Sequence, residues 1–169
     1  MKSFARLVFV VALLGCLVLS ASGQAKKVGI VPKTDLKTVV PTNYFFSGQV
    51  APVQLRNSVA IRLSDNKLIV AGLVDTSGYS SETAQKYQGF FITEAKVTIE
   101  DKTVGPGQYG FGFAQDGKFY VLDVAGNEVA SVTAQADDAL KGPTPLQVKQ
   151  DGSNYRLYAG KKYVVLKAE

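Results

Sequence analysis

Short apolar segments alternate with turn residues along most of the chain, a pattern typical of antiparallel β structure. Residues 59–63 alternate apolar and polar side chains, and residues 67–74 are almost continuously apolar. Period-two alternation and short apolar runs between turn residues both predict strands. The same criteria predict further strands at residues 90–99, 108–114, 118–124, 128–134, 146–150, 155–158 and 162–166.

Residue pairs that favour tight turns separate these strands. Asp116-Gly117 and Asp151-Gly152 are examples, because glycine readily takes the positive φ that short hairpin loops require. The other pairs at such places are Asp65-Asn66, Asp101-Lys102, Gly126-Asn127 and Ala159-Gly160. The predicted strands are therefore joined mainly by hairpins.

One short helix interrupts the strands. It is predicted near residues 81–88, where Ser80 or Ser81 can cap its N-terminus and Gly89 can end it. Because long helices do not alternate with the strands, the pattern argues against a doubly wound α/β fold. The predicted fold class is all-β: an antiparallel β-sandwich or barrel of about 8–10 short strands.

The beginning of the chain has the features of an export signal. Lys2 and Arg6 precede the apolar run 7–19, and small residues up to Ala25 offer a cleavage site. This run is shorter than the roughly 20 residues that a membrane-spanning helix needs, and no later stretch is long enough either. Residues 1–25 are therefore predicted to be a signal peptide, with no membrane span elsewhere.

Leu13-Leu14-Gly15-Cys16 raises an alternative, because a bacterial lipoprotein signal ends at the cysteine that carries the lipid. Leu14 is bulky where such signals prefer a smaller residue, and the apolar run continues through Leu19. These features argue against a lipid anchor at Cys16. The expected location is periplasmic or extracellular.

After the signal peptide, residues 26–43 mix lysine and proline with short apolar pairs, which predicts a loosely attached lead-in. A single β domain is predicted for residues 44–169. The chain has no histidine, and its one cysteine is Cys16, so common zinc ligands, the Ser-His-Asp triad and cysteine nucleophiles are all missing from the mature chain. No metal or cofactor is predicted.

Charge gives little indication of a partner. Of 19 basic residues, two lie in the signal peptide, which leaves 17 against 14 acidic residues. No run of basic residues is longer than two, whereas a nucleic-acid surface needs clustered lysine and arginine. Nucleic acid is therefore not an expected partner.

Residues 105–113 read GPGQYGFGF and match the G-x-G-x-x-G spacing of a nucleotide-binding loop. Such a loop needs a following helix to hold the pyrophosphate, whereas aromatic residues alternate with glycines here as in a strand. If Asp116-Gly117 forms a two-residue turn, Phe111 lies opposite Leu122. Gly110 and Gly112 then form a bare face, against which core groups or a ligand come close.

The stretch from Leu73 to Asn127 resembles uncharacterised exported bacterial β-domain proteins, in which a PG-x-Y-x-F turn and strand recurs. Pro106-Gly107-Gln108-Tyr109 with Phe111 carries the motif. The resemblance implies export and β architecture. It brings no known ligand, reaction or functional residue.

Asp75 lies in a stretch that partly matches the sequence motifs of an aspartic-protease site and of a metal-binding site. Ser77 stands where an aspartic protease has glycine, and Tyr79 occupies the last ligand position of a D-x-S-x-S metal site. Both motifs lack one essential residue. Asp75 and Ser77 are instead expected to end a strand with local hydrogen bonds.

The leading functional prediction is a non-catalytic exported domain that binds a ligand or another protein. Tyrosine combines an apolar ring with a polar tip, so Tyr79 and Tyr109 are candidate binding residues. Asp75 and Asp123 are candidate polar contacts. The expected partner is a small molecule, a glycan or an envelope protein.

The alternative prediction is a carboxylate-dependent hydrolase of a cell-wall or extracellular polymer. Such an enzyme needs two carboxyl groups at a defined separation across the bond that is cleaved. The candidate carboxyl groups are those of Asp75, Glu94, Glu100 and Asp123.

Overall fold

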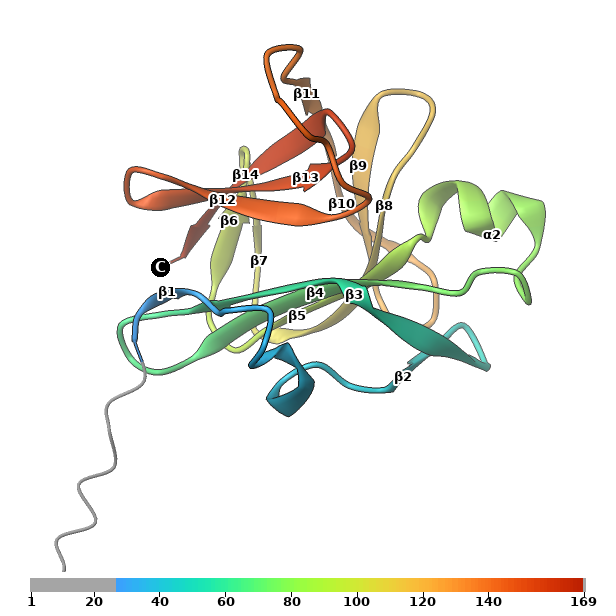
Figure 1. The fold of residues 1–169 in the computed structure, drawn as a ribbon. Coiled ribbons are helices and arrows are strands. Elements are labelled where there is room, and N and C mark those ends of the chain that lie inside the picture. The colour runs from blue at the N-terminus through green and yellow to red at the C-terminus, as the bar shows by residue number, and fades with distance from the viewer. Residues whose placement is uncertain (1–26, 169) are drawn as a thin grey trace, which may run out of the picture.

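The computed structural model describes residues 27–168, which form two antiparallel sheets and one short α-helix (Figure 1). The all-β class predicted from the sequence is confirmed. The described range contains 14 strands, more than the predicted number. The additional strands have two to four residues, too few to show a clear alternation in the sequence.

The first sheet has the strand order β1-β3-β4-β5-β8-β9-β10, with β2 beside β3. All its neighbouring strands are antiparallel. Its strands are β1 (Gly29–Ile30), β2 (Asn43–Phe46), β3 (Gln49–Arg62), β4 (Leu68–Val74), β5 (Gly89–Thr93), β8 (Gly107–Phe113), β9 (Lys118–Leu122) and β10 (Glu128–Thr133).

The second sheet has the order β12-β13-β14-β6-β7, with β11 beside β14. Figure 1 shows β12, β13 and β14 across from β3, β4 and β5, so the two sheets face each other. Its strands are β6 (Val97–Ile99), β7 (Lys102–Val104), β11 (Gln135–Ala136), β12 (Gln147–Asp151), β13 (Asn154–Ala159) and β14 (Lys162–Ala168).

The strand predicted at residues 90–99 is in fact two strands in different sheets, because β5 ends at Thr93 and β6 begins at Val97. The Thr93 hydroxyl donates to the Ala95 carbonyl (2.6 Å) and accepts from the Ala95 N–H (3.2 Å). These bonds close a sharp turn at a buried position. The prediction of one strand is wrong because a side chain here replaces ladder hydrogen bonds.

The β8–β9 hairpin differs from its predicted register by one residue. The Ala114 N–H donates to the Lys118 carbonyl (2.9 Å), and Gly117 takes a φ of 83°. The loop therefore has three residues and not two. Phe111 consequently lies opposite Val121, one residue earlier than predicted. A shift of one residue changes which side chains share a face.

The fold has two large apolar cores and a small third cluster of Leu140, Tyr158 and Tyr163. The first lies between the sheets and contains Phe91, Phe111 and Phe119 from the first sheet with Leu157 and Leu166 from the second. The second lies on the outer face of the first sheet, under the lead-in, β2 and the helix. Its buried members are Val31, Leu36, Val40, Tyr44, Phe46, Ala51, Ala60, Val70, Val74, Tyr87, Phe90, Ala114, Tyr120 and Leu122.

The lead-in is packed against the first sheet, which corrects the prediction that it is loosely attached. Leu36 lies in a 3₁₀ turn (Leu36–Thr38) and is only 2% exposed. Val31 and Val40 are also buried, and the Val31 N–H donates to the Ala60 carbonyl (2.8 Å). The many lysine and proline residues of this segment made its three buried apolar residues difficult to recognise from the sequence.

The predicted helix is α2 (Ser81–Lys86), with Ser80 as its N-cap. The Ser80 hydroxyl accepts a hydrogen bond from the Thr83 N–H (3.2 Å). The helix ends earlier than predicted because Tyr87 is extended, with φ −118° and ψ 110°, and its side chain is fully buried. Burial of this ring, and not a glycine, sets the end of α2.

Core groups press against the bare face of β8. A Cβ atom on Gly110 would lie 2.5 Å from the Phe46 ring and 2.9 Å from the Tyr87 ring. Those two rings stack with centroids 3.7 Å apart at 10°. A Cβ atom on Gly112 would collide with the Lys86 carbonyl. Of the two explanations for the glycines, core packing is therefore the correct one.

Residues 27–168 include no helix that is both long and apolar enough to cross a membrane. The predicted signal peptide, with Cys16, lies outside the described residues.

We expect Gly112→Ala to destabilise the protein by about 1–3 kcal/mol, the usual cost of overpacking a filled core. The new methyl group would displace the Lys86 carbonyl and with it the end of α2. Urea denaturation followed by circular dichroism measures the effect. Gly105→Ala is the matched control, because a Cβ atom there meets nothing within 4 Å. Equal stability of the two variants would contradict this packing.

Candidate functional site

The two candidate tyrosines use their hydroxyls within the fold. The Tyr79 hydroxyl donates to the Phe46 carbonyl (3.1 Å), and its ring packs edge-on against Tyr87 with centroids 5.0 Å apart. The Tyr109 hydroxyl donates to the Gly105 carbonyl (3.0 Å). Tyr79 thereby joins the loop before α2 to the end of β2, and Tyr109 braces the turn before β8.

The two candidate aspartates close turns. Asp75 accepts from the Ser77 N–H (3.0 Å), which holds the pKa of its carboxyl below the usual value and confirms the predicted local role. Asp123 accepts from the Asn127 side-chain amide and from the N–H groups of Asn127 and Ala125, each at 2.9 Å. These bonds, with the Asn127 amide first, lower the pKa of the Asp123 carboxyl.

The remaining candidate carboxylates also bind backbone groups. Glu94 accepts from the Leu68 N–H (2.7 Å), and Glu100 accepts from the Val165 N–H (2.7 Å). Within residues 27–168, no group of three or more histidine, cysteine, aspartate or glutamate side chains could hold a metal ion.

Two tyrosine hydroxyls beneath the outer layer have no hydrogen-bond partner among the described residues, those of Tyr44 and Tyr87. Burial raises the pKa of both above the ordinary tyrosine value. Both hydroxyls are therefore neutral at physiological pH, as an ordinary tyrosine hydroxyl also is.

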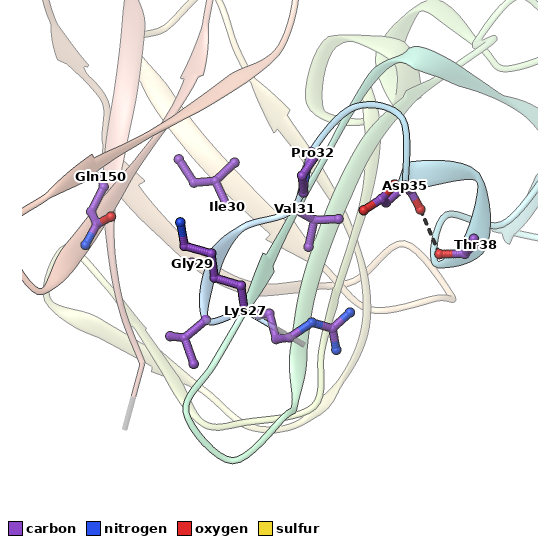
Figure 2. Close-up of a pocket in the computed structure, with 10 residues that line it drawn as sticks. Lys27, Gly29, Ile30, Val31, Pro32, Asp35, Thr38 and Gln150 are labelled. Carbon is purple, nitrogen blue, oxygen red and sulfur yellow. Dashed lines mark hydrogen bonds between the residues drawn. The ribbon is translucent and has the colours of Figure 1, made fainter. Parts of the chain in front are cut away.

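A cleft of about 660 Å³ lies where the lead-in crosses the edge of the first sheet (Figure 2). Figure 2 shows Gln150 of β12 on one side, Asp35 and Thr38 on the other, and Ile30 and Val31 between them. The Thr38 hydroxyl donates to the Asp35 carbonyl (2.7 Å), which holds the 3₁₀ turn at the cleft's rim. The residues lining the cleft are Lys27, Val28, Gly29, Ile30, Val31, Pro32, Asp35, Thr38, Arg62 and Gln150.

The cleft lies at an open seam between the two sheets. β1 is the outer strand of the first sheet and β12 the outer strand of the second, and no backbone hydrogen bond within the described range joins them. A second cavity of about 220 Å³ shares Ile30 and Val31 with the cleft and reaches Gln147 on β12. The Gln147 side-chain nitrogen is buried there without a partner in the same range.

Arg62 is the charged residue that the sequence analysis missed. It ends β3 on the same face as Ala60, and it is 7% exposed. Its Nη1 donates to the Asn66 side-chain oxygen (2.8 Å). The sequence feature that could have revealed it is that Arg62 follows Ser58 and Ala60 at every second position, which places an arginine on a strand face of small residues. None of the four candidate binding residues lines the cleft.

The comparisons with known proteins found no match: no family model, no curated protein and no solved structure is significantly similar to this chain. The resemblance to exported bacterial β-domain proteins therefore stays a prediction.

We expect Asp123→Ala to lower the midpoint of thermal denaturation at pH 7, because three N–H groups lose their acceptor. The folded-state pKa of this carboxyl is lowered, so its contribution is complete above the ordinary value of about 3.9 and disappears as the pH falls through the lower folded value. The difference between wild type and variant should therefore shrink from pH 7 to pH 2.

Asp138→Ala is the control, because no hydrogen bond to its carboxylate exists among the described residues. Its midpoint should match that of the wild type at each pH. A difference for Asp123→Ala that stays constant down to pH 2 would show that the carboxylate does not act as described.

Proposed function

We propose that this protein is a non-catalytic exported binding domain whose ligand site is the cleft between the lead-in and β12. The proposal rests on the volume of the cleft and on the residues that line it. The volume of about 660 Å³ lies in the range of small-molecule sites. Val28, Ile30, Val31 and Pro32 form an apolar wall with a few polar groups around it, as such sites usually have.

Exposure supports the same assignment. Val28 is 53% exposed and Ile30 is 43% exposed, so apolar surface faces solvent where the lead-in enters β1. Apolar side chains gathered around a concavity are typical of ligand sites, whereas single exposed ones are common on any surface. A ligand that covered both residues would gain roughly 25 cal/mol for each Å² of apolar surface removed from water.

The proposal places the ligand away from Tyr79, Tyr109, Asp75 and Asp123, since their polar groups already serve turns and loops. The same reasoning disfavours the hydrolase alternative, because its candidate carboxylates hold strand ends and turns. A small molecule is the partner that a cleft of this size fits, in preference to a long glycan or a protein.

We expect Ile30→Asn to weaken binding of small apolar compounds at the cleft at least fivefold, from the loss of roughly 1 kcal/mol of apolar contact. Decanol and indole are suitable apolar probes, titrated into the exported protein and followed by NMR shifts of the Gly29, Ile30 and Val31 amides. Val129→Asn is the matched control, because Val129 is 48% exposed on β10 and outside the cleft. If no probe shifts these amides, or if both variants behave alike, the cleft is not the site.

We expect no turnover of cell-wall or extracellular polysaccharides by the purified protein. Release of reducing ends from peptidoglycan and from soluble glycans measures this directly. Activity that disappears in Asp75→Ala, Glu94→Ala or Asp123→Ala would establish the hydrolase alternative instead.

A further inference from the structure

Arg62 places a buried positive charge at the wall of the cleft. A guanidinium carries five N–H donors, and the hydrogen bond from Nη1 to the neutral Asn66 oxygen uses one of them. Among residues 27–168, no carboxylate lies within 4.0 Å of this guanidinium. Within the described range, the guanidinium therefore has no counter-ion within 4.0 Å, and its remaining nitrogens, which are not among the buried atoms without a partner, reach the solvent of the cleft.

Water in the cleft can hydrate these nitrogens, but a charge-assisted hydrogen bond to an anion is stronger than one to a neutral acceptor. An anion that entered the cleft would supply the missing partner. The planar guanidinium matches a carboxylate particularly well, since the two groups can form parallel N–H···O bonds. Charge complementarity thus favours an anionic ligand.

The space beside Arg62 is open to the cleft. Gly29 lies directly opposite Arg62 in the β1–β3 pairing, so a side chain at this position would share its face. A Cβ atom built on Gly29 meets nothing within 4 Å. Glycine, with a φ of 114°, therefore leaves room for a ligand group next to the guanidinium.

The other charged residues that line the cleft also favour an anionic ligand. Lys27 adds a second cation to the lining. Asp35 is the one acidic residue among those that line the cleft, and its carboxylate accepts a hydrogen bond from the Thr34 hydroxyl (3.0 Å). The lining therefore has a net positive charge beside an apolar wall.

Building on the proposed function, we propose that the ligand is a carboxylate with an aliphatic body. The Arg62 guanidinium binds the carboxylate. The aliphatic part crosses the edge strand β1 to contact Ile30, which lies on the opposite face of the strand from Gly29 and Arg62, and it also contacts Val28 and Pro32. Lys27 adds long-range attraction at the rim. Two sources share this chemistry: a free aliphatic acid and the carboxyl end of an apolar peptide.

Decanoate and decanol separate the charge from the apolar body, because the two probes differ only at the head group. Isothermal titration of the exported protein should give at least tenfold tighter binding of decanoate than of decanol, as a charge-assisted hydrogen bond provides. Acetate should bind more weakly than decanoate, because it lacks the aliphatic body. A capped apolar tripeptide with a free carboxyl end, compared with its amide, tests the second source.

Arg62→Gln should remove the preference for decanoate and leave decanol binding within twofold. Arg56→Gln is the matched control, because Arg56 is exposed and outside the cleft. Should Arg62→Gln fail to fold, the wild-type ratio of decanoate to decanol, and its loss below the pKa of the acid, still decide the question.

The outcomes distinguish this inference from the proposed function. If decanol or another neutral probe binds at the cleft as tightly as decanoate, the cleft remains the site and the anionic ligand is wrong. If decanoate binds equally well to the wild type and to folded Arg62→Gln, Arg62 is not its partner and the inference is overturned. If neither acid nor neutral probe shifts the cleft amides, both proposals fail.

Discussion

The stacked contact of Phe46 and Tyr87 over the glycine face of β8 holds the outer layer to the first sheet. The two rings come from the end of β2 and the end of α2, which are separate in the sequence. Their close approach requires Gly110 to have no side chain. With the rings in place, the β2–β3 hairpin and α2 are both fixed, and the second core is closed on that side. Filling this bare face would separate the layer from the sheet.

Local sequence signals predicted much of the fold. Strand positions, hairpin turns and the N-cap at Ser80 depend on neighbouring residues, and they follow from alternation and from residues that tolerate positive φ. The β2–β3 hairpin was missed, although Ser47 and Gly48 both take positive φ, at 47° and 78°. Two adjacent turn residues, directly after the apolar pair Phe45-Phe46, are the signal that could have revealed it.

Features that depend on distant contacts could not be predicted in this way. The switch between sheets after Thr93 depends on a buried hydroxyl, and the end of α2 depends on burial of Tyr87. The candidate site has the same limitation. Strand alternation places Arg62 on the face of Ala60, but only the packed lead-in makes that face an interior surface, and its polar composition indicated a loose segment. The candidate tyrosines and aspartates were identified by chemical type alone, which gives no information about their partners.

The position of β14 determines the order in which the molecule can assemble. This strand is the last one that the structure describes, yet it lies inside the second sheet, between β13 and β6. Leu166 pairs with Ile99, so the β6–β7 hairpin gains a further neighbour in its own sheet only when β14 is in place. Sheets that depend on such distant pairings form slowly, because the long intervening loop must close first. The strands of the first sheet all lie within residues 29–133, whereas the second sheet, and with it the seam that bounds the cleft, forms only once residues 162–168 are available.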